Sequence, residues 1–107
     1  MFFSKGLESL TDEKYTDAVR YLSEAIKLDS QFVDAWNNRG VAYHHFRSYD
    51  DALTDLGKAI ALNSQFAPAY YNRANTYFEL GRYEEALQDI NQVIQLQTDS
   101  AYVYSNR

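Results

Sequence analysis

Apolar residues recur along this chain with the three-then-four spacing of amphipathic helices. One such face runs through Trp36, Gly40 and Tyr43, and the next runs through Ala52 and Leu56. The pattern predicts an all-α chain with helices at residues 2–12, 15–28, 33–46, 49–62, 67–80 and 83–96, and a short further helix from residue 101.

The predicted helices form pairs that repeat every 34 residues. Residues 33–66 and 67–100 are identical at ten of their 34 aligned positions, where unrelated segments would share roughly two. A helix pair of this length cannot bury its own apolar face and must stack on its neighbours. We therefore expect one domain over residues 1–107, with repeats at about 1–32, 33–66 and 67–100 and the start of a fourth at 101–107.

Small residues and turn residues recur at fixed places in these repeats. Gly40 is expected to let the two helices of its pair approach closely, whereas Gly57 is expected to face solvent. Ser48, with Asp51 three residues later, predicts a capping box at the start of the second helix. Gly81 is expected to end the first helix of the third pair.

Composition excludes several classes of function. The chain has no cysteine, which excludes disulfides, thiolate metal sites and cysteine nucleophiles. Its net charge of -5, with scattered lysines and arginines, argues against nucleic-acid binding. No apolar stretch approaches the length of a membrane span. We expect no membrane association, no cofactor, and an intracellular, cytoplasmic protein.

The motif running Trp36, Arg39, Gly40, Tyr43, followed by Tyr49 and the small residues after it, resembles the tetratricopeptide repeat. The departures are mild: Ser30, Ser64 and Thr98 replace the closing proline. The resemblance covers the whole chain. It implies a right-handed superhelix of antiparallel helix pairs, in which the first helix of each pair lines a concave groove. It also implies a protein or peptide partner.

The residues of the first helices that the core does not need are the candidate peptide-binding site. Several of them are apolar or aromatic, and a helix face exposed only to solvent does not need so many apolar side chains. The candidates are Phe3, Leu7, Asn37, Asn38, Val41, His45, Tyr71, Asn72, Asn75, Phe78, Glu79 and Asn106.

Asn38, Asn72 and Asn106 recur in register on this face. An asparagine amide offers a donor and an acceptor, so it can bind a peptide unit without reading its side chains. The arrangement resembles the asparagine ladder of O-linked N-acetylglucosamine transferases. Alternatively, these asparagines cap or bridge neighbouring helices.

A second ligand class is the C-terminal carboxylate, which chaperone-binding tetratricopeptide domains hold with lysine, arginine and asparagine. In both possible registers of this clamp, the only matching residue is the central asparagine. The positions are Phe3, Leu7, Asn38, Pro68 and Asn72 in one register, and Asn37, Val41, Asn72, Tyr102 and Asn106 in the other. Without cations a desolvated carboxylate lacks its charge-assisted hydrogen bonds, so we expect no clamp.

Arginine and histidine residues are further candidates for a functional role. Arg39, Arg73 and Arg107 recur, and we expect them to pair with nearby acids rather than bind phosphate. His44 and His45 are adjacent, so their side chains diverge on a helix and do not form an i,i+4 metal site. His45 stands at the position of Glu79 in the next repeat, which suggests a pH-sensitive groove contact.

No catalytic motif is present, and each pair of adjacent acids, such as Asp50 and Asp51, opens a helix whose dipole it complements. We therefore expect a non-catalytic interaction module that binds an extended peptide. The alternatives are a structural or self-assembling segment of a longer solenoid, and a substrate adaptor in a larger enzyme or cochaperone. The incomplete fourth repeat suggests end-to-end self-association through residues 90–107.

Overall fold

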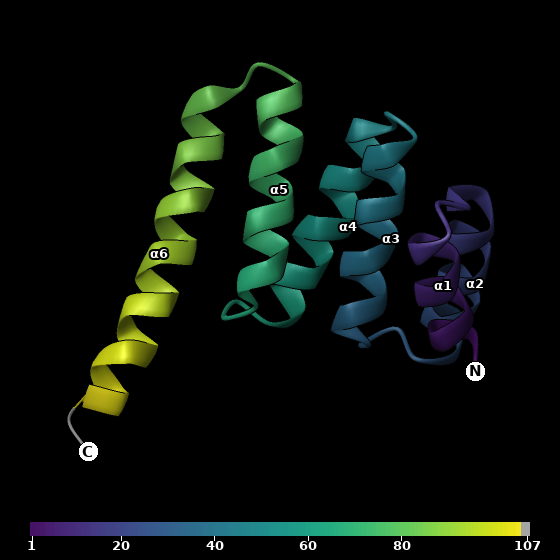
Figure 1. Ribbon diagram of the computed structural model, residues 1–107, viewed down its shortest axis with the longest axis horizontal. Helices are drawn as coiled ribbons and strands as arrows, with labels where there is room; N and C mark the ends of the chain where they lie inside the picture. Colours follow the sequence, from purple (N-terminus) through teal and green to yellow (C-terminus); the bar gives the residue numbers. More distant parts are fainter. Residues whose placement is uncertain (106–107) are drawn as a thin grey trace.

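The computed structural model describes the backbone of residues 1–105 and the side chains of residues 1–98. Within this range the chain is all-helical, in the predicted order (Figure 1). The helices are α1 (Phe2–Thr11), α2 (Tyr15–Leu28), α3 (Val33–His45), α4 (Tyr49–Leu62), α5 (Ala67–Glu79) and α6 (Tyr83–Ser105). No helix in the described part of the chain is both long and apolar enough to cross a membrane.

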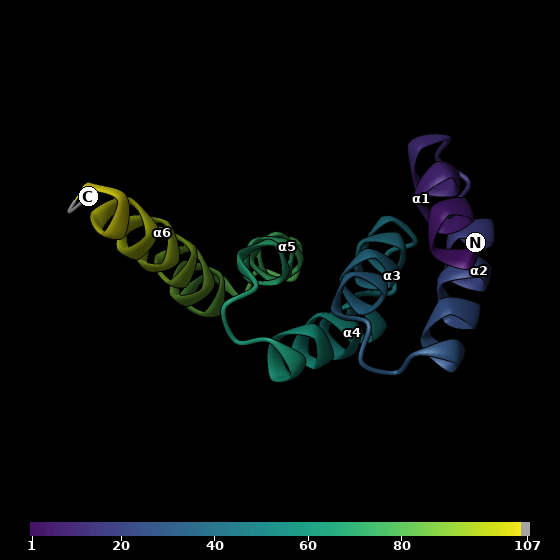
Figure 2. The same ribbon diagram turned by 90° about the horizontal axis from the view of Figure 1, so that it is seen from below.

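The helices form a solenoid in which each one packs on the next. Contacts join every consecutive pair of helices, and the first helices of successive pairs also meet, α1 with α3 and α3 with α5. The second helices α2, α4 and α6 make no such contacts with one another over the described residues. Seen from below, the row bends into an arc with α3 and α5 on its inner side and α4 on its outer side (Figure 2). The first helices therefore line the concave face.

The core of the first two pairs is a close contact between a glycine and a leucine. A methyl group at Gly6 would stand 2.7 Å from Leu22 Cγ, and one at Gly40 would stand 2.7 Å from Leu56 Cγ. Both leucines are fully buried, so neither has free space into which to retreat. Gly40 is thus the packing residue that the sequence predicts. Gly57 faces open space, also as predicted.

The turns inside the pairs share one geometry, which differs from the predicted capping box. Glu13, Arg47 and Gly81 occupy the same register position and adopt positive φ values of 60°, 65° and 75°. After α3, Arg47 N–H donates to His44 O and Ser48 N–H donates to Tyr43 O, which is a Schellman motif. Gly81 ends α5 in the same way, as predicted. The capping-box prediction is wrong, because the side chain of Ser48 forms no capping hydrogen bond.

The predicted break after residue 96 is also wrong, because α6 runs without interruption from Tyr83 to Ser105. The two earlier pairs end at Asp29 and Asn63, whose side chains accept the N–H of the residue two positions later. This Asx turn stops the helix. Residue 97 is glutamine, a good helix former that is not suited to that turn, so the helix continues.

Exchanging each glycine of the second pair for alanine should have opposite effects on stability. Gly40→Ala should lower the free energy of unfolding by about 1–3 kcal/mol, because the new methyl group overpacks Leu56. Gly57→Ala, the matched control, should raise it by about 1 kcal/mol, because it adds helix propensity without a clash. Urea denaturation of both variants measures the difference. Equal effects of the two substitutions would contradict this account of the core.

The left-handed turn position provides a second test. Arg47→Gly should raise the free energy of unfolding by about 0.5–1 kcal/mol, because glycine removes the steric cost of positive φ while losing more entropy on folding. Gly81→Ala should lower it by about 1 kcal/mol for the converse reason. Thermal and urea denaturation report both changes. A stabilised Gly81→Ala variant would show that these turns are not strained.

Candidate functional site

A pocket of about 260 Å³ lies on the concave side between the ends of α3 and α5. Its floor includes Leu56 of α4, and its walls come from the two groove helices. The lining residues are Val41, His44, His45, Leu56, Asn72, Asn75, Thr76, Phe78 and Glu79. Six of the twelve residues in the predicted peptide-binding site meet here: Val41, His45, Asn72, Asn75, Phe78 and Glu79.

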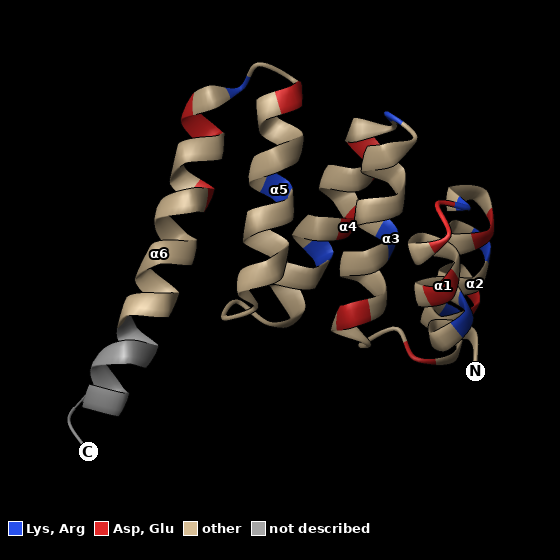
Figure 3. Ribbon diagram, in the orientation of Figure 1, with Lys and Arg blue, Asp and Glu red and all other residues tan. Residues whose placement is uncertain are grey.

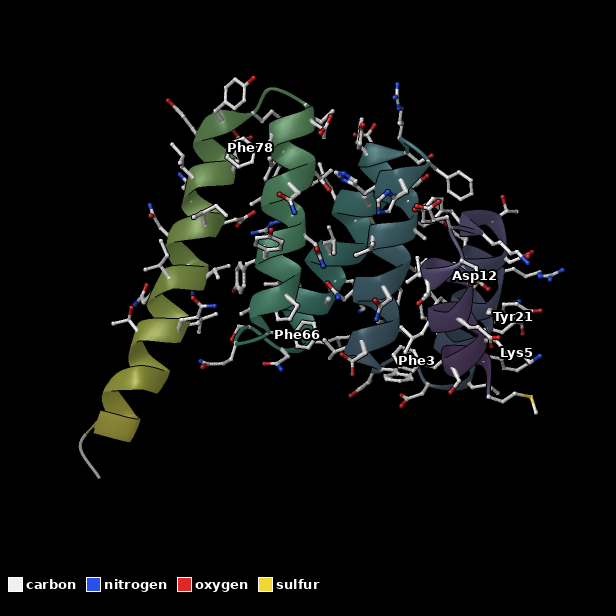
Figure 4. All side chains as sticks on the ribbon, in the orientation of Figure 1. Phe3, Lys5, Asp12, Tyr21, Phe66 and Phe78 are labelled. Atoms are coloured by element: carbon white, nitrogen blue, oxygen red, sulfur yellow. The ribbon has the colours of Figure 1, made fainter. Side chains whose placement is uncertain are left out.

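Helix α5 carries two exposed aromatic side chains, Tyr71 and Phe78. Phe78 is 41% exposed and Tyr71, which lies outside the pocket lining, is 53% exposed. Figure 4 shows Phe78 beside the upper end of α5. Partly exposed aromatic rings next to a pocket are typical anchor points for a partner.

The structure places the predicted residues of the first helix differently. The ring of Phe3 packs on that of Phe32, with centroids 4.5 Å apart, and against the buried core. Phe3 therefore contributes to the core that α1 forms with α2 and α3, away from the pocket (Figure 4). Leu7 is 38% exposed and lies outside the pocket lining. Asn106 lies outside the described residues.

The groove asparagines take part in hydrogen bonds within the protein. Asn38 Nδ2 donates to Asp34 O, one turn earlier in α3, at 2.8 Å. Asn72 Nδ2 donates to Asn37 Oδ1 at 3.0 Å and so bridges α5 to α3. Asn37 is buried, with 6% of its surface exposed, so it supports Asn72 rather than facing the groove. Asn38 and Asn72 each retain a carbonyl oxygen and a second amide hydrogen, which can still meet a peptide unit.

His44 is fixed on the wall of the pocket. Its Nδ1 lies 2.9 Å from Thr76 Oγ1, and the hydroxyl of this fully buried threonine donates to Asn72 O. Nδ1 must therefore donate its hydrogen to Thr76. Burial lowers the pKa of His44, the neighbouring His45 lowers it further, and Glu79 opposes both. The net effect favours the neutral imidazole over the cation.

His45 is exposed and stacks on another helix pair. Its ring lies 4.5 Å from that of Tyr15 in α2, with an interplanar angle of 8°. The rings of His44 and His45 contact each other edge to face, with centroids 5.7 Å apart and an interplanar angle of 82°.

Two of the three recurring arginines, Arg39 and Arg73, pair with acids, as predicted, and Arg107 lies outside the described residues. Arg39 binds Asp55 with Nε–Oδ2 and Nη2–Oδ1 distances of 2.7 and 2.9 Å. Arg73 binds Asp89 in the same fork, at 2.8 and 2.7 Å. These hydrogen bonds raise the pKa of each arginine. Burial raises the pKa of Asp55 against the opposing effect of Arg39. We therefore infer that the ion pair fixes how α3 and α4 are oriented more than it adds to the net stability of the fold.

Sequence reasoning missed two residues of the pocket and the partners of the arginines. Leu56 reaches the pocket floor from a second helix, and Thr76 reaches it from a fully buried position. No spacing rule indicates either one. The aspartates could have been identified, because Asp55 and Asp89 each follow their arginine by sixteen residues.

The geometry agrees with known structures. The Arabidopsis OM64 TPR domain is 28% identical, with a TM-score of 0.87 over 91% of this chain and 80% of that one. The first TPR domain of Spaghetti (RPAP3), bound to the HSP90 peptide SRMEEVD, is 28% identical, with a TM-score of 0.88 over 91% of this chain and 77% of that one. The TPR2B domain of yeast Sti1, in a complex with pHsp70, is 24% identical, with a TM-score of 0.90 over 99% and 85%, and shows the shared fold alone.

Comparison of the sequence itself gives the family. No curated protein sequence matches the chain significantly. Residues 3–68 and 67–99, however, match profiles of the tetratricopeptide repeat. Because these matches together follow the helix pairs from α1 into α6, the chain belongs to the tetratricopeptide repeat family.

Proposed function

We propose that this chain is a non-catalytic interaction module that binds an extended peptide segment along its concave face. The observation that carries the proposal is the pocket between α3 and α5, where an apolar floor meets polar side chains that can orient a ligand. Tetratricopeptide domains are generally interaction modules without catalysis, and a related domain, that of Spaghetti (RPAP3), is bound to a peptide. We place the protein in the cytoplasm, where such a module would meet its partner.

The asparagines contribute a backbone contact in this proposal. Asn38 and Asn72 hold successive peptide units through their free carbonyl oxygens and second amide hydrogens. The internal bonds to Asp34 and Asn37 support this role, because they hold each amide in one orientation. The proposed repeats, with boundaries near residues 32 and 66, put Asn38 and Asn72 at equivalent positions. Asn106 follows Asn72 by the same 34 residues but lies outside the described residues, and α6 continues across the proposed boundary at residue 100.

Selection of binding peptides tests the proposal directly. A phage-displayed library of random twelve-residue peptides is panned on the immobilised chain, and the enriched sequences are synthesised for calorimetry. Phe78→Ala and Tyr71→Ala should each weaken the selected peptides about tenfold, because exposed aromatic anchors carry much of the binding energy. Asn38→Ala should cost about 1 kcal/mol.

Leu87→Ala is the matched control, because Leu87 is an apolar residue with 55% exposure on α6, outside the pocket. It should leave peptide affinity unchanged. Circular dichroism checks that each variant remains folded. Peptides whose affinity is insensitive to both aromatic substitutions would refute binding in the groove.

A second function, self-assembly, is favoured by an apolar stripe on α6. Tyr83, Leu87 and Ile94 are 60%, 55% and 54% exposed. Their counterparts on α4 (Tyr49, Leu53 and Ile60) are partly buried, and α5 packs on that helix. We propose that a second copy of the chain covers the α6 stripe, with the contact continuing through residues 90–107.

Sedimentation velocity tests this association between about 10 µM and 1 mM, a range that spans weak protein contacts. The sedimentation coefficient should rise with concentration, and Leu87→Glu should reduce that rise by introducing a charge into the contact. Leu28→Glu, at a residue 76% exposed on α2, is the control and should have no effect. A concentration-independent monomer would contradict self-assembly and leave the peptide-binding proposal intact.

A further inference from the structure

The groove helices carry unbalanced negative charge. Helices α3 and α5 each contain one arginine and one acid, which are Arg39 with Asp34 and Arg73 with Glu79. Both arginines are engaged by the aspartates of α4 and α6 described above. Asp34 and Glu79, in contrast, form no ion pair with any residue in the described range. Figure 3 shows how sparse charges are on α3 and α5 compared with α1 and α2.

The position of Glu79 adds to this negative field. It is the last residue of α5, and His45 is the last residue of α3. Both helices end on the same side of the molecule (Figure 1), so the negative ends of two helix dipoles lie at the pocket. No lysine or arginine lines the pocket, and burial lowers the pKa of His44, which disfavours its cationic form.

An apolar surface lies beside this acid. Partly exposed Val41 and Phe78 line the same pocket, and fully buried Leu56 packs behind them. A ligand that satisfies both features must carry an apolar group and a cation close together. An acidic segment would find no cation for its carboxylates and would be repelled by Glu79.

We infer that the pocket selects peptide segments in which a lysine or arginine lies next to an apolar side chain. The apolar side chain enters the pocket and the cation pairs with Glu79. This inference rests on the proposed function and names its ligand class. It assigns to Glu79 the role of a specificity residue, which distinguishes this groove from one that holds acidic peptides.

Three fluorescein-labelled pools of ten-residue peptides test the inference with the intact chain. Each pool has a central leucine, followed by lysine, glutamine or glutamate, and the remaining positions are randomised among uncharged residues. Fluorescence polarisation at 50 mM NaCl should show the Leu-Lys pool binding about five- to tenfold more tightly than the Leu-Glu pool. The preference should shrink at 500 mM NaCl, because salt screens an exposed ion pair.

Variants at Glu79 separate charge selection from groove binding. Glu79→Gln should remove the preference and leave binding of the Leu-Gln pool unchanged, and Glu79→Lys should reverse the preference. The matched control is Glu84→Lys, which makes the same charge change at an exposed position on α6 outside the pocket. It should retain the Leu-Lys preference.

Each outcome distinguishes the two proposals. Equal binding of the three pools, with sensitivity to Phe78→Ala, would overturn the charge selection and leave the proposed function standing. A preference that survives Glu79→Lys would overturn the assignment of Glu79. No binding of any pool, or binding that is insensitive to Phe78→Ala, would overturn the proposed function and this inference with it.

Discussion

The close contact between a glycine and a leucine inside the first two helix pairs is the constraint on which the rest of the structure depends. Gly6 against Leu22 and Gly40 against Leu56 leave no room for a methyl group. This contact sets the spacing within the first two pairs. Between pairs, each second helix packs on the next first helix, and the first helices also meet one another, whereas the second helices do not over the described residues. The concave face and its pocket follow from that stacking. Leu56 contributes both to the core of its helix pair and to the pocket, because it fills the space at Gly40 and also lies at the pocket floor.

Most of the fold could be predicted from the sequence, since the 34-residue period and the helical spacing report the same core. The errors concern local turn chemistry. The continuous α6 follows from Gln97, which stands where Asp29 and Asn63 form Asx turns, and attention to that one position would have predicted it. The hydroxyl of Ser48 gave a capping signal, but the Schellman motif after α3 already determines that turn.

The candidate site was harder to predict, because a helical wheel shows which face a residue occupies but not what contacts it. Phe3 and Phe78 both lie on first helices, yet Phe3 packs on Phe32 and Phe78 borders a pocket. The asparagine pattern likewise hides the contact between Asn72 and Asn37, which depends on the spacing of α3 and α5. Such contacts between repeats have no fixed sequence signature. The sequence therefore indicated which helices face the concave side, but only half of the predicted site residues line the pocket.

The repeats are most alike where they pack and differ where the pocket lies. Ala52 and Ala86 are identical and fully buried, and Asp55 and Asp89 hold their arginines in the same fork. These pairs have an electrostatic consequence as well as a structural one, because they occupy the arginines of α3 and α5 and leave the pocket without a cation. His45, by contrast, is replaced by Glu79 one repeat later. A repeated core with unlike residues on its inner face provides one fixed scaffold, and we propose that the residues that break the repeat, Glu79 foremost, determine which peptide the scaffold accepts.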